Sequence, residues 1–408
     1  MAASPRGRSE FGRPALPALA APLAGLTVID ASTLFAGPFA ARLLGDFGAE
    51  IIKVEQPSGD PLRRFGPAHD DVPLLWKVLS RNKKSVVLDL HEPGDAERFR
   101  RLAAGADALV ENFRPGTLER WGLGPEVLAE VNPRLVLARV TAFGQDGPYA
   151  RRPGFGTLAE AMSGLAAMSG EPDGPPALPA FPLGDAVAGL HAALAVLIAL
   201  RARDVVGTGQ IADVAIAETL ISTLGAQLTV FEHLGLKPER IGNRSHNSAP
   251  RDVYRCADDR WVAVSAPAGP VAERVVRLVG RPDLGAEPWF ATGTGRAEHR
   301  ELIDDAVRPW IAARRRDEVV AAFEAAEAAV APVYEVDDVL ADPQFRARGL
   351  TVEVPDAELG SVRMPGVPFR LSATPGRIDW AGPPIGAHTE DVCGPAEPAR
   401  PTAGETGA

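Results

Sequence analysis

Short apolar segments alternate with helical patterns through the first half of this 408-residue chain, and this alternation constrains the fold more than any other feature. Each apolar segment is typical of a buried β-strand. They are residues 26–30, 51–55, 85–90, 108–113 and 134–140, with one more at 211–216. Helical patterns lie between them, beginning with AGPFAARLLGDFGAE at 36–50. Such a series packs as a parallel sheet covered on both faces, so the sequence predicts an α/β, Rossmann-like domain.

The turn after the first predicted strand does not carry a dinucleotide fingerprint. It reads ASTLFAGPFA, without the GxGxxG spacing that lets a backbone approach a pyrophosphate. A nicotinamide or flavin dinucleotide cofactor is therefore not predicted, although the sheet type would suit one.

One carboxylate stands at the start of a long apolar stretch. Residues 181–200 read FPLGDAVAGLHAALAVLIAL, in which Asp185 follows Gly184 and precedes a run with the composition of a buried helix. That run is short for a membrane span and contains Gly189 and His191. Aspartate is a good helix N-cap. From this stretch alone, Asp185 is either a cap or a group placed for chemistry.

The remaining sequence predicts a large domain, a smaller one and two tails. Residues 1–22, rich in Ala, Pro and Arg, and residues 394–408 are expected to be disordered tails. Residues 23–240 form the large domain and residues 241–345 a smaller α+β domain with a hairpin made by DVYRC and WVAVSA. A long helix is expected over 217–235. Residues 346–393, with a second hairpin in TVEVPDAELGSVRMPG, are expected to return to the large domain.

Composition indicates which kinds of partner and which cellular compartment suit the protein. The net charge is −10 and the pI about 5.3, whereas nucleic-acid binding usually needs a basic face. Cys256 and Cys393 are far apart in sequence, which favours a reducing compartment, and we expect a cytoplasmic protein with no membrane association. The seven histidines show no HExxH or similar spacing, so no metal is predicted.

Six motifs in order resemble one enzyme family. They are LAGLTVIDASTLFAGPFAARLLGDFGAEIIKVEQPSGDPLRRFGP, SRNKKSVVLDL, VENFRPGTLERWGLG, AFGQDGPYARRPGF, FPLGDAVAGLHAAL and GTGQIADVAIAE. Over about residues 24 to 392 the chain resembles the class III CoA-transferases, which include formyl-CoA, carnitine-CoA and succinyl-CoA-dependent carboxylate CoA-transferases. The resemblance implies an interlocked homodimer that moves CoA from an acyl-CoA donor to a free carboxylic acid, with CoA as substrate and no tightly bound cofactor.

The resemblance also assigns residues. The family's nucleophilic Asp falls on Asp185, which would pass through an aspartyl anhydride and an aspartyl-CoA thioester. At a helix start, this carboxylate is expected to stay ionised. The family's CoA contacts fall on Phe35, Ala36, Gln56, Leu88, Asp89, Leu90, His91, Asn112, Phe113, Arg114, Arg120, Phe155 and Gly156. Phe113 could instead be a core residue.

The phosphates of CoA require cations, and several basic residues follow predicted strand ends. They are Arg63, Arg64, Arg81, Lys83, Lys84, Arg114 and Arg120. For the RNKK run in particular, the alternative is an ordinary solvated surface.

The chain also departs from parts of the family pattern. Gln56 is neutral where some members carry a cation, and Phe155 and Gly156 stand where formyl-CoA transferases have Tyr and Glu. The glycine-rich loop of the formyl-CoA and oxalate enzymes is replaced by GNRSHNSAP. Four of its residues could orient a second carboxylate or hydroxyl of an acceptor, or form a plain solvated loop. They are Arg244, Ser245, His246 and Asn247.

Two other functions remain possible from the sequence. The related α-methylacyl-CoA racemases need a second base, a His, at the step that here reads Phe155–Gly156, and phenylalanine cannot take a proton. A non-catalytic acyl-CoA-binding protein would tolerate the loss of Asp185. The chain resembles the succinyl-CoA-dependent dicarboxylate enzymes more than the oxalate enzymes, which makes a dicarboxylate one possible acceptor.

Overall fold

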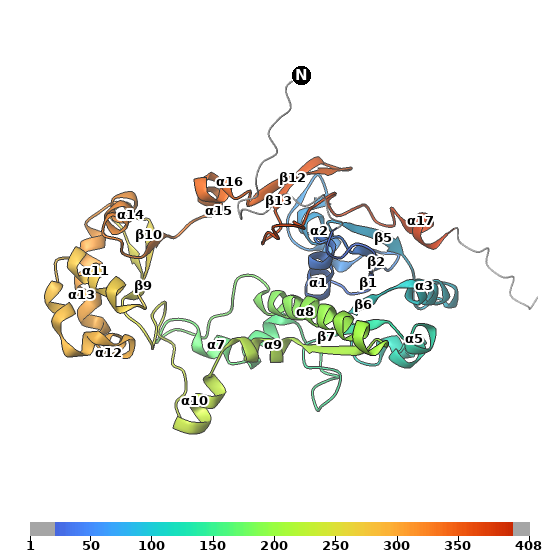
Figure 1. The fold of residues 1–408 in the computed structure, drawn as a ribbon, viewed down its shortest axis with the longest axis horizontal. Helices are drawn as coiled ribbons and strands as arrows, with labels where there is room; N and C mark the ends of the chain where they lie inside the picture. The colour runs from blue at the N-terminus through green and yellow to red at the C-terminus, as the bar shows by residue number, and fades with distance from the viewer. Residues whose placement is uncertain (1–20, 395–408) are drawn as a thin grey trace, which may run out of the picture. The chain divides into compact units, whose positions relative to one another are not determined.

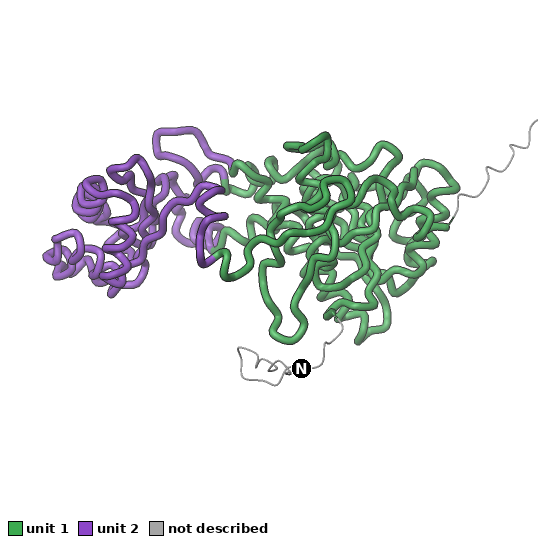
Figure 2. Tube along the Cα trace, turned by 90° about the horizontal axis from the view of Figure 1, so that it is seen from above, with its two compact units in different colours: residues 1–165, 179–225, 345–408 green, residues 166–178, 226–344 purple. Residues whose placement is uncertain are grey.

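The computed structural model describes residues 21–394, which form two compact units (Figure 2). Within the described residues, unit 1 comprises residues 21–165, 179–225 and 345–394, and unit 2 comprises residues 166–178 and 226–344. The tails predicted at 1–22 and 394–408 lie almost entirely outside the described residues. The chain therefore leaves unit 1 twice and twice returns to it.

Unit 1 is built around a six-stranded sheet in which all neighbouring strands are parallel, as predicted. The strands are β1 (Thr27–Asp30), β2 (Glu50–Glu55), β5 (Lys83–Val87), β6 (Ala108–Glu111), β7 (Val136–Thr141) and β8 (Ile211–Ala215). Their order is β5-β2-β1-β6-β7-β8. Strands β2 and β5 lie on one side of β1, and strands β6, β7 and β8 lie on its other side. Open sheets of this kind bind ligands at the carboxyl ends of the strands where the order reverses.

Helices cover both faces of the sheet (Figure 1). On one face lie α1 (Ala36–Gly45), α8 (Leu183–Val206) and α9 (Ile216–Thr223); on the other lie α3 (Pro93–Gly105) and α5 (Pro125–Val131). Neighbouring strand residues point to opposite cores, so that Val28 packs with α1 and α8 whereas Ile29 packs with Phe99 of α3. This pattern explains why the strands are apolar throughout.

Helices α1 and α8 pack closely through small residues. Ala40 and Ala41 of α1 and Ala188 and Ala192 of α8 are all buried. A side chain on Gly189 would come within 2.7 Å of the Ala36 carbonyl oxygen, so glycine is needed at this position. By length and composition α8 could cross a membrane, yet in this structure it is a helix of the unit 1 core.

Two helices differ from the prediction. Helix α1 ends at Gly45 instead of continuing to Gly48, whose φ of +96° turns the chain into β2. The long helix predicted over 217–235 is two helices, α9 and α10 (Gln227–Leu234). Gly225 between them has a φ of +77°, a left-handed conformation that ends a helix.

The C-terminal part of the described chain packs on unit 1. It contains the second predicted hairpin, β12 (Thr351–Asp356) with β13 (Gly360–Pro365), and then α17 (Thr389–Cys393). Lys77 Nζ of α2 (Leu74–Leu79) lies 2.6 Å from Asp356 Oδ2, and Trp76 Nε1 donates to the Pro383 carbonyl oxygen at 2.9 Å. These buried contacts hold residues more than 250 positions apart in sequence together.

Unit 2 contains the other predicted hairpin. An antiparallel sheet of order β11-β10-β9 packs against three amphipathic helices. These elements are β9 (Arg251–Arg255), β10 (Trp261–Ser265), β11 (Val330–Pro332), α11 (Gly269–Leu278), α13 (Arg300–Ala312) and α14 (Arg316–Ala325).

Short elements complete the described chain. They are η1 (Pro61–Arg64), β3 (Ala68–His69), β4 (Val72–Pro73), α4 (Thr117–Arg120), α6 (Gly156–Met162), α7 (Leu165–Met168), η2 (Pro282–Ala286), η3 (Pro288–Ala291), α12 (Gly293–Glu298), α15 (Val336–Ala341) and α16 (Pro343–Ala347).

Candidate active site

Asp185 lies in the first turn of α8 but does not cap it. The helix begins at Leu183, with Pro182 before it, so Asp185 is its third residue. Gly184, directly before Asp185, is buried against α6, and its N–H donates to the carboxylate of Glu160 at 2.8 Å. The capping alternative is therefore wrong, and the Asp185 carboxylate is left for another role.

Gly156 brings a backbone N–H directly to the Asp185 carboxylate. Gly156 is the first residue of α6, and its N–H donates to that carboxylate. A side chain on Gly156 would place its Cβ 2.7 Å from Asp185 Cγ, which is a steric overlap. Only glycine allows the backbone to approach the carboxylate this closely. This explains why the chain has Gly156 where formyl-CoA transferases have an acid.

The electrostatics of the site raise the proton affinity of Asp185. Burial, and then the negative charge of Glu160, raise the pKa of Asp185 to about 6, while the Gly156 N–H acts in the opposite direction. The position of Asp185 in the first turn of α8 therefore does not keep its pKa low. At neutral pH the group is still mostly ionised, and it is a stronger base than an ordinary aspartate.

Glu160 is the functional neighbour that sequence reasoning missed. Its side chain is only 2% exposed, on α6, among apolar residues of the unit 1 core. An acid inside the pattern GTLAEAM looks like a solvated helix residue, and the sequence holds no signal that the fold buries it beside Asp185.

Asp185 opens into a cavity of about 250 Å³ at the carboxyl ends of β1, β6 and β7. Seven of the predicted site residues line this cavity, namely Phe35, Ala36, Asn112, Phe113, Arg114, Phe155 and Asp185. The loops after β1 and β6 supply most of these residues. The site thus lies at the reversal of strand order, where the sheet topology favours ligand binding.

A second cavity of about 220 Å³ gathers six predicted CoA contacts. They are Gln56, Leu88, Asp89, Leu90, His91 and Phe113. Trp121 joins them, with its ring edge-on to those of His91 and Phe113 at centroid distances of 4.8 and 5.0 Å. An aromatic wall of this kind suits a flat base such as adenine.

The two cavities share a wall. Thr33 and Phe113 line both of them. The Asn112 side chain fixes this wall, because its Oδ1 accepts from the Thr33 N–H at 2.7 Å and its Nδ2 donates to the Thr33 carbonyl oxygen at 2.8 Å. Next to it, the Leu34 N–H donates to Asp60 at 3.2 Å and Leu34 has a φ of +62°. The loop that carries Phe35 and Ala36 is therefore rigidly held.

Three of the seven candidate phosphate-binding cations are structural instead. Arg81 Nη2 lies 2.6 Å from Asp46 Oδ2, and Lys83 Nζ lies 2.8 Å from Asp30 Oδ2, with all four side chains fully buried. Arg63 lies 2.6 Å from Glu55 and stacks on Trp76 at 3.6 Å from the ring centroid. The prediction that these cations are available to phosphate is wrong.

The other candidate cations are accessible. Arg114 is exposed at the Asp185 cavity, and Lys84 pairs with Glu50 at the surface. Arg64 donates to the Ser58 carbonyl oxygen at 2.9 Å. Arg120 is exposed at the end of α4, where its guanidinium donates to Thr117 at 2.9 Å, and it is not among the residues lining the two cavities.

In unit 2, the loop GNRSHNSAP is anchored by its own arginine. The Arg244 guanidinium lies 3.0 Å from Glu301, 3.2 Å from Asp304 and 3.5 Å from Asp252. Three carboxylates therefore already engage the residue that could have oriented an acceptor. His246 and Asn247 are exposed, and Ser245 accepts from the Asn247 N–H at 3.1 Å.

The lining of the Asp185 cavity includes no histidine among the described residues. His191, one and a half turns further along α8, bonds the Val187 carbonyl oxygen through Nδ1 at 2.9 Å. The described chain also holds no cluster of His, Cys, Asp and Glu side chains suited to a metal ion. The chemistry available at this site is that of a carboxylate, backbone donors and two arginines, Arg114 and Arg152.

The site thus combines a partly buried carboxylate with two neighbouring cavities at the carboxyl ends of the sheet strands, where open α/β sheets bind ligands. The model of CoA-transferase family III matches residues 23–389, and the chain belongs to this family. It is an enzyme, a CoA-transferase whose substrates are CoA thioesters and carboxylic acids.

Relatives extend over nearly the whole chain. It is 40% identical over 373 residues to the succinyl-CoA–D-citramalate CoA-transferase of Chloroflexus aurantiacus, covering 91% of this chain and 93% of that protein. It is 41% identical over 376 residues to the succinyl-CoA–L-malate CoA-transferase beta subunit of the same organism, with 91% and 93% covered. A CAIB/BAIF family protein from Brucella suis has the same fold, with a TM-score of 0.81, 31% identity and coverage of 92% and 99%.

Proposed function

We propose that Asp185 is the covalent nucleophile of this CoA-transferase. The observation that carries the proposal is the position of its carboxylate: it lies in the cavity at the sheet switch point, with a pKa raised to about 6 by burial and by Glu160. Because the group is still ionised at neutral pH and more basic than usual, it is a better nucleophile than a surface aspartate.

The reaction proceeds in two balanced halves. The Asp185 carboxylate attacks the donor thioester, which releases CoA thiolate and leaves a mixed anhydride. The thiolate attacks the Asp185 carbonyl carbon, which releases the donor's carboxylate and leaves an aspartyl-CoA thioester. The acceptor carboxylate then attacks this thioester to form a second anhydride, and the thiolate attacks its acyl carbon to give the new acyl-CoA and free Asp185.

The chain supplies specific groups for these steps. The Gly156 N–H, which bonds the resting carboxylate, is positioned to donate to an oxyanion that develops on the Asp185 carboxyl group. Thr33 and Phe113 line both the Asp185 cavity and the aromatic cavity of Trp121, so the two cavities are neighbours. CoA would lie across both cavities, with adenine near Trp121 and the thioester at Asp185.

The acceptor is proposed to be a dicarboxylate. Two relatives that match over nine-tenths of the chain are named for citramalate and malate, both dicarboxylates. Two arginines, Arg114 and Arg152, line the Asp185 cavity, so a cation is available to a second carboxylate even if one of them serves CoA.

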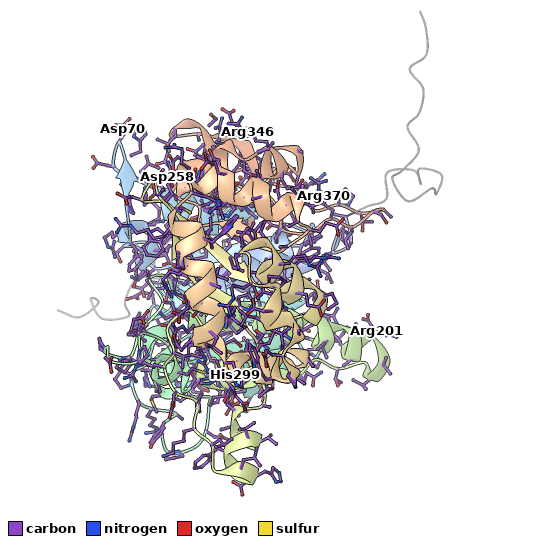
Figure 3. The ribbon with its side chains drawn as sticks, turned by 90° about the vertical axis from the view of Figure 1, so that its left-hand side faces the viewer. Asp70, Arg201, Asp258, His299, Arg346 and Arg370 are labelled. Atoms are coloured by element: carbon purple, nitrogen blue, oxygen red, sulfur yellow. The ribbon has the colours of Figure 1, made fainter. Side chains whose placement is uncertain are left out.

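The working molecule is proposed to be an interlocked homodimer, as the family resemblance implies, in the cytoplasm. Leu190, Leu194 and Ile198 form an apolar row on α8 and are 53%, 54% and 60% exposed. Arg201 projects from the exposed part of the same helix (Figure 3). Apolar rows of this kind on a long helix are typical of surfaces that a second subunit covers. Sedimentation of the purified protein should give the mass of two chains.

Trapping tests the nucleophile. The enzyme is incubated with succinyl-CoA, treated with hydroxylamine and digested, and the peptide containing Asp185 is expected to carry a hydroxamate. Asp185→Asn should give no adduct, whereas Asp146→Asn, at an exposed loop position, should react as wild type. Turnover by the Asp185→Asn protein without an adduct would refute the covalent mechanism.

A further inference from the structure

Two arginines line the Asp185 cavity, and they come from different loops of unit 1. Arg114 follows Phe113, the residue that lines both cavities. Arg152 belongs to the segment between β7 and α6, which also contributes Gly154 and Phe155 and lines the Asp185 cavity only. Arg114 therefore adjoins a residue shared with the second cavity, where the proposed function places CoA, whereas the segment of Arg152 does not line that second cavity.

Stacking holds the Arg152 side chain and leaves its hydrogen-bond donors free. Its guanidinium carbon lies 3.7 Å from the centroid of the Tyr149 ring, and that ring is edge-on to Phe143, a residue of the cavity lining. Among the described residues, no ion pair or side-chain hydrogen bond of this guanidinium is found, and the residue is exposed. A stacked guanidinium keeps its planar fork of N–H groups available to a carboxylate.

Two neutral side chains of this cavity already have partners, and neither supplies a positive charge. The Asn112 amide is used by Thr33, and the Thr141 hydroxyl accepts from the Gly144 N–H at 3.0 Å. A second carboxylate on a substrate bound at Asp185 can form a charge-assisted pair only with a cation, and the cations of this lining are Arg114 and Arg152. Arg114 is next to Phe113, which also lines the second cavity. Arg152 is not near that shared residue in the chain, and its segment lines the Asp185 cavity alone of the two.

We propose that Arg152 determines acceptor specificity by binding the distal carboxylate of a dicarboxylate while the other carboxylate reacts at Asp185. This rests on the proposed function and extends it, because it names the residue that selects diacids over monoacids. Arg114 is left to the CoA moiety. An acceptor without a distal carboxylate would leave the Arg152 guanidinium without its ionic partner.

The test is a competition in one tube. Enzyme and succinyl-CoA are mixed with a dicarboxylate and a monocarboxylate of equal chain length, glutarate with valerate or malate with 3-hydroxybutyrate. The two new acyl-CoA products are counted by mass spectrometry. Because both acceptors meet the same aspartyl-CoA intermediate, their product ratio does not depend on the donor half of the reaction.

Arg152→Gln is expected to lower the ratio of diacid to monoacid product by roughly 10- to 100-fold, the scale of a charge-assisted pair. Arg152→Lys should recover part of it. Arg151→Gln is the matched control: it removes the same charge one residue away, at an exposed side chain outside the cavity lining, and should keep the wild-type ratio. Arg114→Gln should raise the KM for succinyl-CoA and leave the ratio unchanged.

Several results would overturn the proposal. The Arg152→Gln ratio could equal that of wild type, the Arg151→Gln ratio could fall equally, or wild type could prefer monoacids. An enzyme that forms the Asp185 adduct but uses none of the diacids would also overturn it. Failure of the proposed function is distinct from all of these, because no Asp185 adduct would then form with any donor.

Discussion

Replacing the Asp185 carboxylate with a neutral amide should stabilise the fold at neutral pH. The pKa of Asp185 is raised from 3.8 to about 6, which means that the folded protein disfavours the charged form. At 1.36 kcal/mol per unit this corresponds to about 3 kcal/mol. Because the side chain is only partly buried, solvent screening reduces the expected gain for Asp185→Asn to about 1–2 kcal/mol in the free energy of unfolding.

The effect of Asp185 on the free energy of unfolding depends on pH in a defined direction. Between the ordinary pKa and about 6, the folded state binds more protons at Asp185 than the unfolded state does, so this group lowers the free energy of unfolding as pH rises. The destabilisation is complete above the folded pKa and disappears below the unfolded one. The advantage of Asp185→Asn should therefore be largest at about pH 7.5 and vanish near about pH 4.

Urea unfolding at both pH values measures the difference without any knowledge of the substrates. Asp146→Asn, which removes an exposed carboxylate, serves as the control and should stay within about 0.5 kcal/mol of wild type at both pH values. An Asp185→Asn protein that is no more stable than wild type at the higher pH, or equally stabilised at both, would refute the electrostatic account of the site.

Three further outcomes follow from the same contacts. Glu160→Gln removes a charge that raises the pKa of Asp185, so the acidic limb of the kcat/KM profile should move to lower pH, by up to about one unit. An unmoved limb would exclude this coupling. Gly156→Ala displaces the Asp185 carboxylate and should lower kcat by about 100-fold while the protein still folds, as circular dichroism would show; full activity would contradict the close approach. Arg81→Ala leaves Asp46 buried without its partner and should cost about 3–5 kcal/mol of stability in urea unfolding, whereas a KM effect alone would restore Arg81 to the CoA site.

The sheet and much of the site were predictable because they depend on local patterns. The apolar strands such as 26–30 are visible as runs bounded by turns, and parallel packing follows from their alternation with helices. The family resemblance assigns Phe35 and Asn112 to one site, and the structure brings their loops together because the parallel strands β1 and β6 end at one edge of the sheet.

The errors have physical causes that are not local. Arg81 and Lys83 look like loop cations, but their partners Asp46 and Asp30 lie 35 and 53 positions earlier, and only the folded sheet brings them together. Glu160 belongs to this class as well, since its effect on Asp185 arises from the packing of α6 against α8. The start of α8 at Leu183 was missed because no standard cap residue precedes it.

Transfer of a heavy oxygen isotope tests the central claim most directly. In the proposed reaction the acceptor carboxylate attacks the aspartyl-CoA thioester, and cleavage of the resulting anhydride leaves one acceptor oxygen on Asp185. An acceptor labelled at both carboxylate oxygens should therefore place label on the Asp185 peptide and on the product thioester after a single turnover. A fully labelled product with an unlabelled Asp185 would contradict the covalent role of this residue.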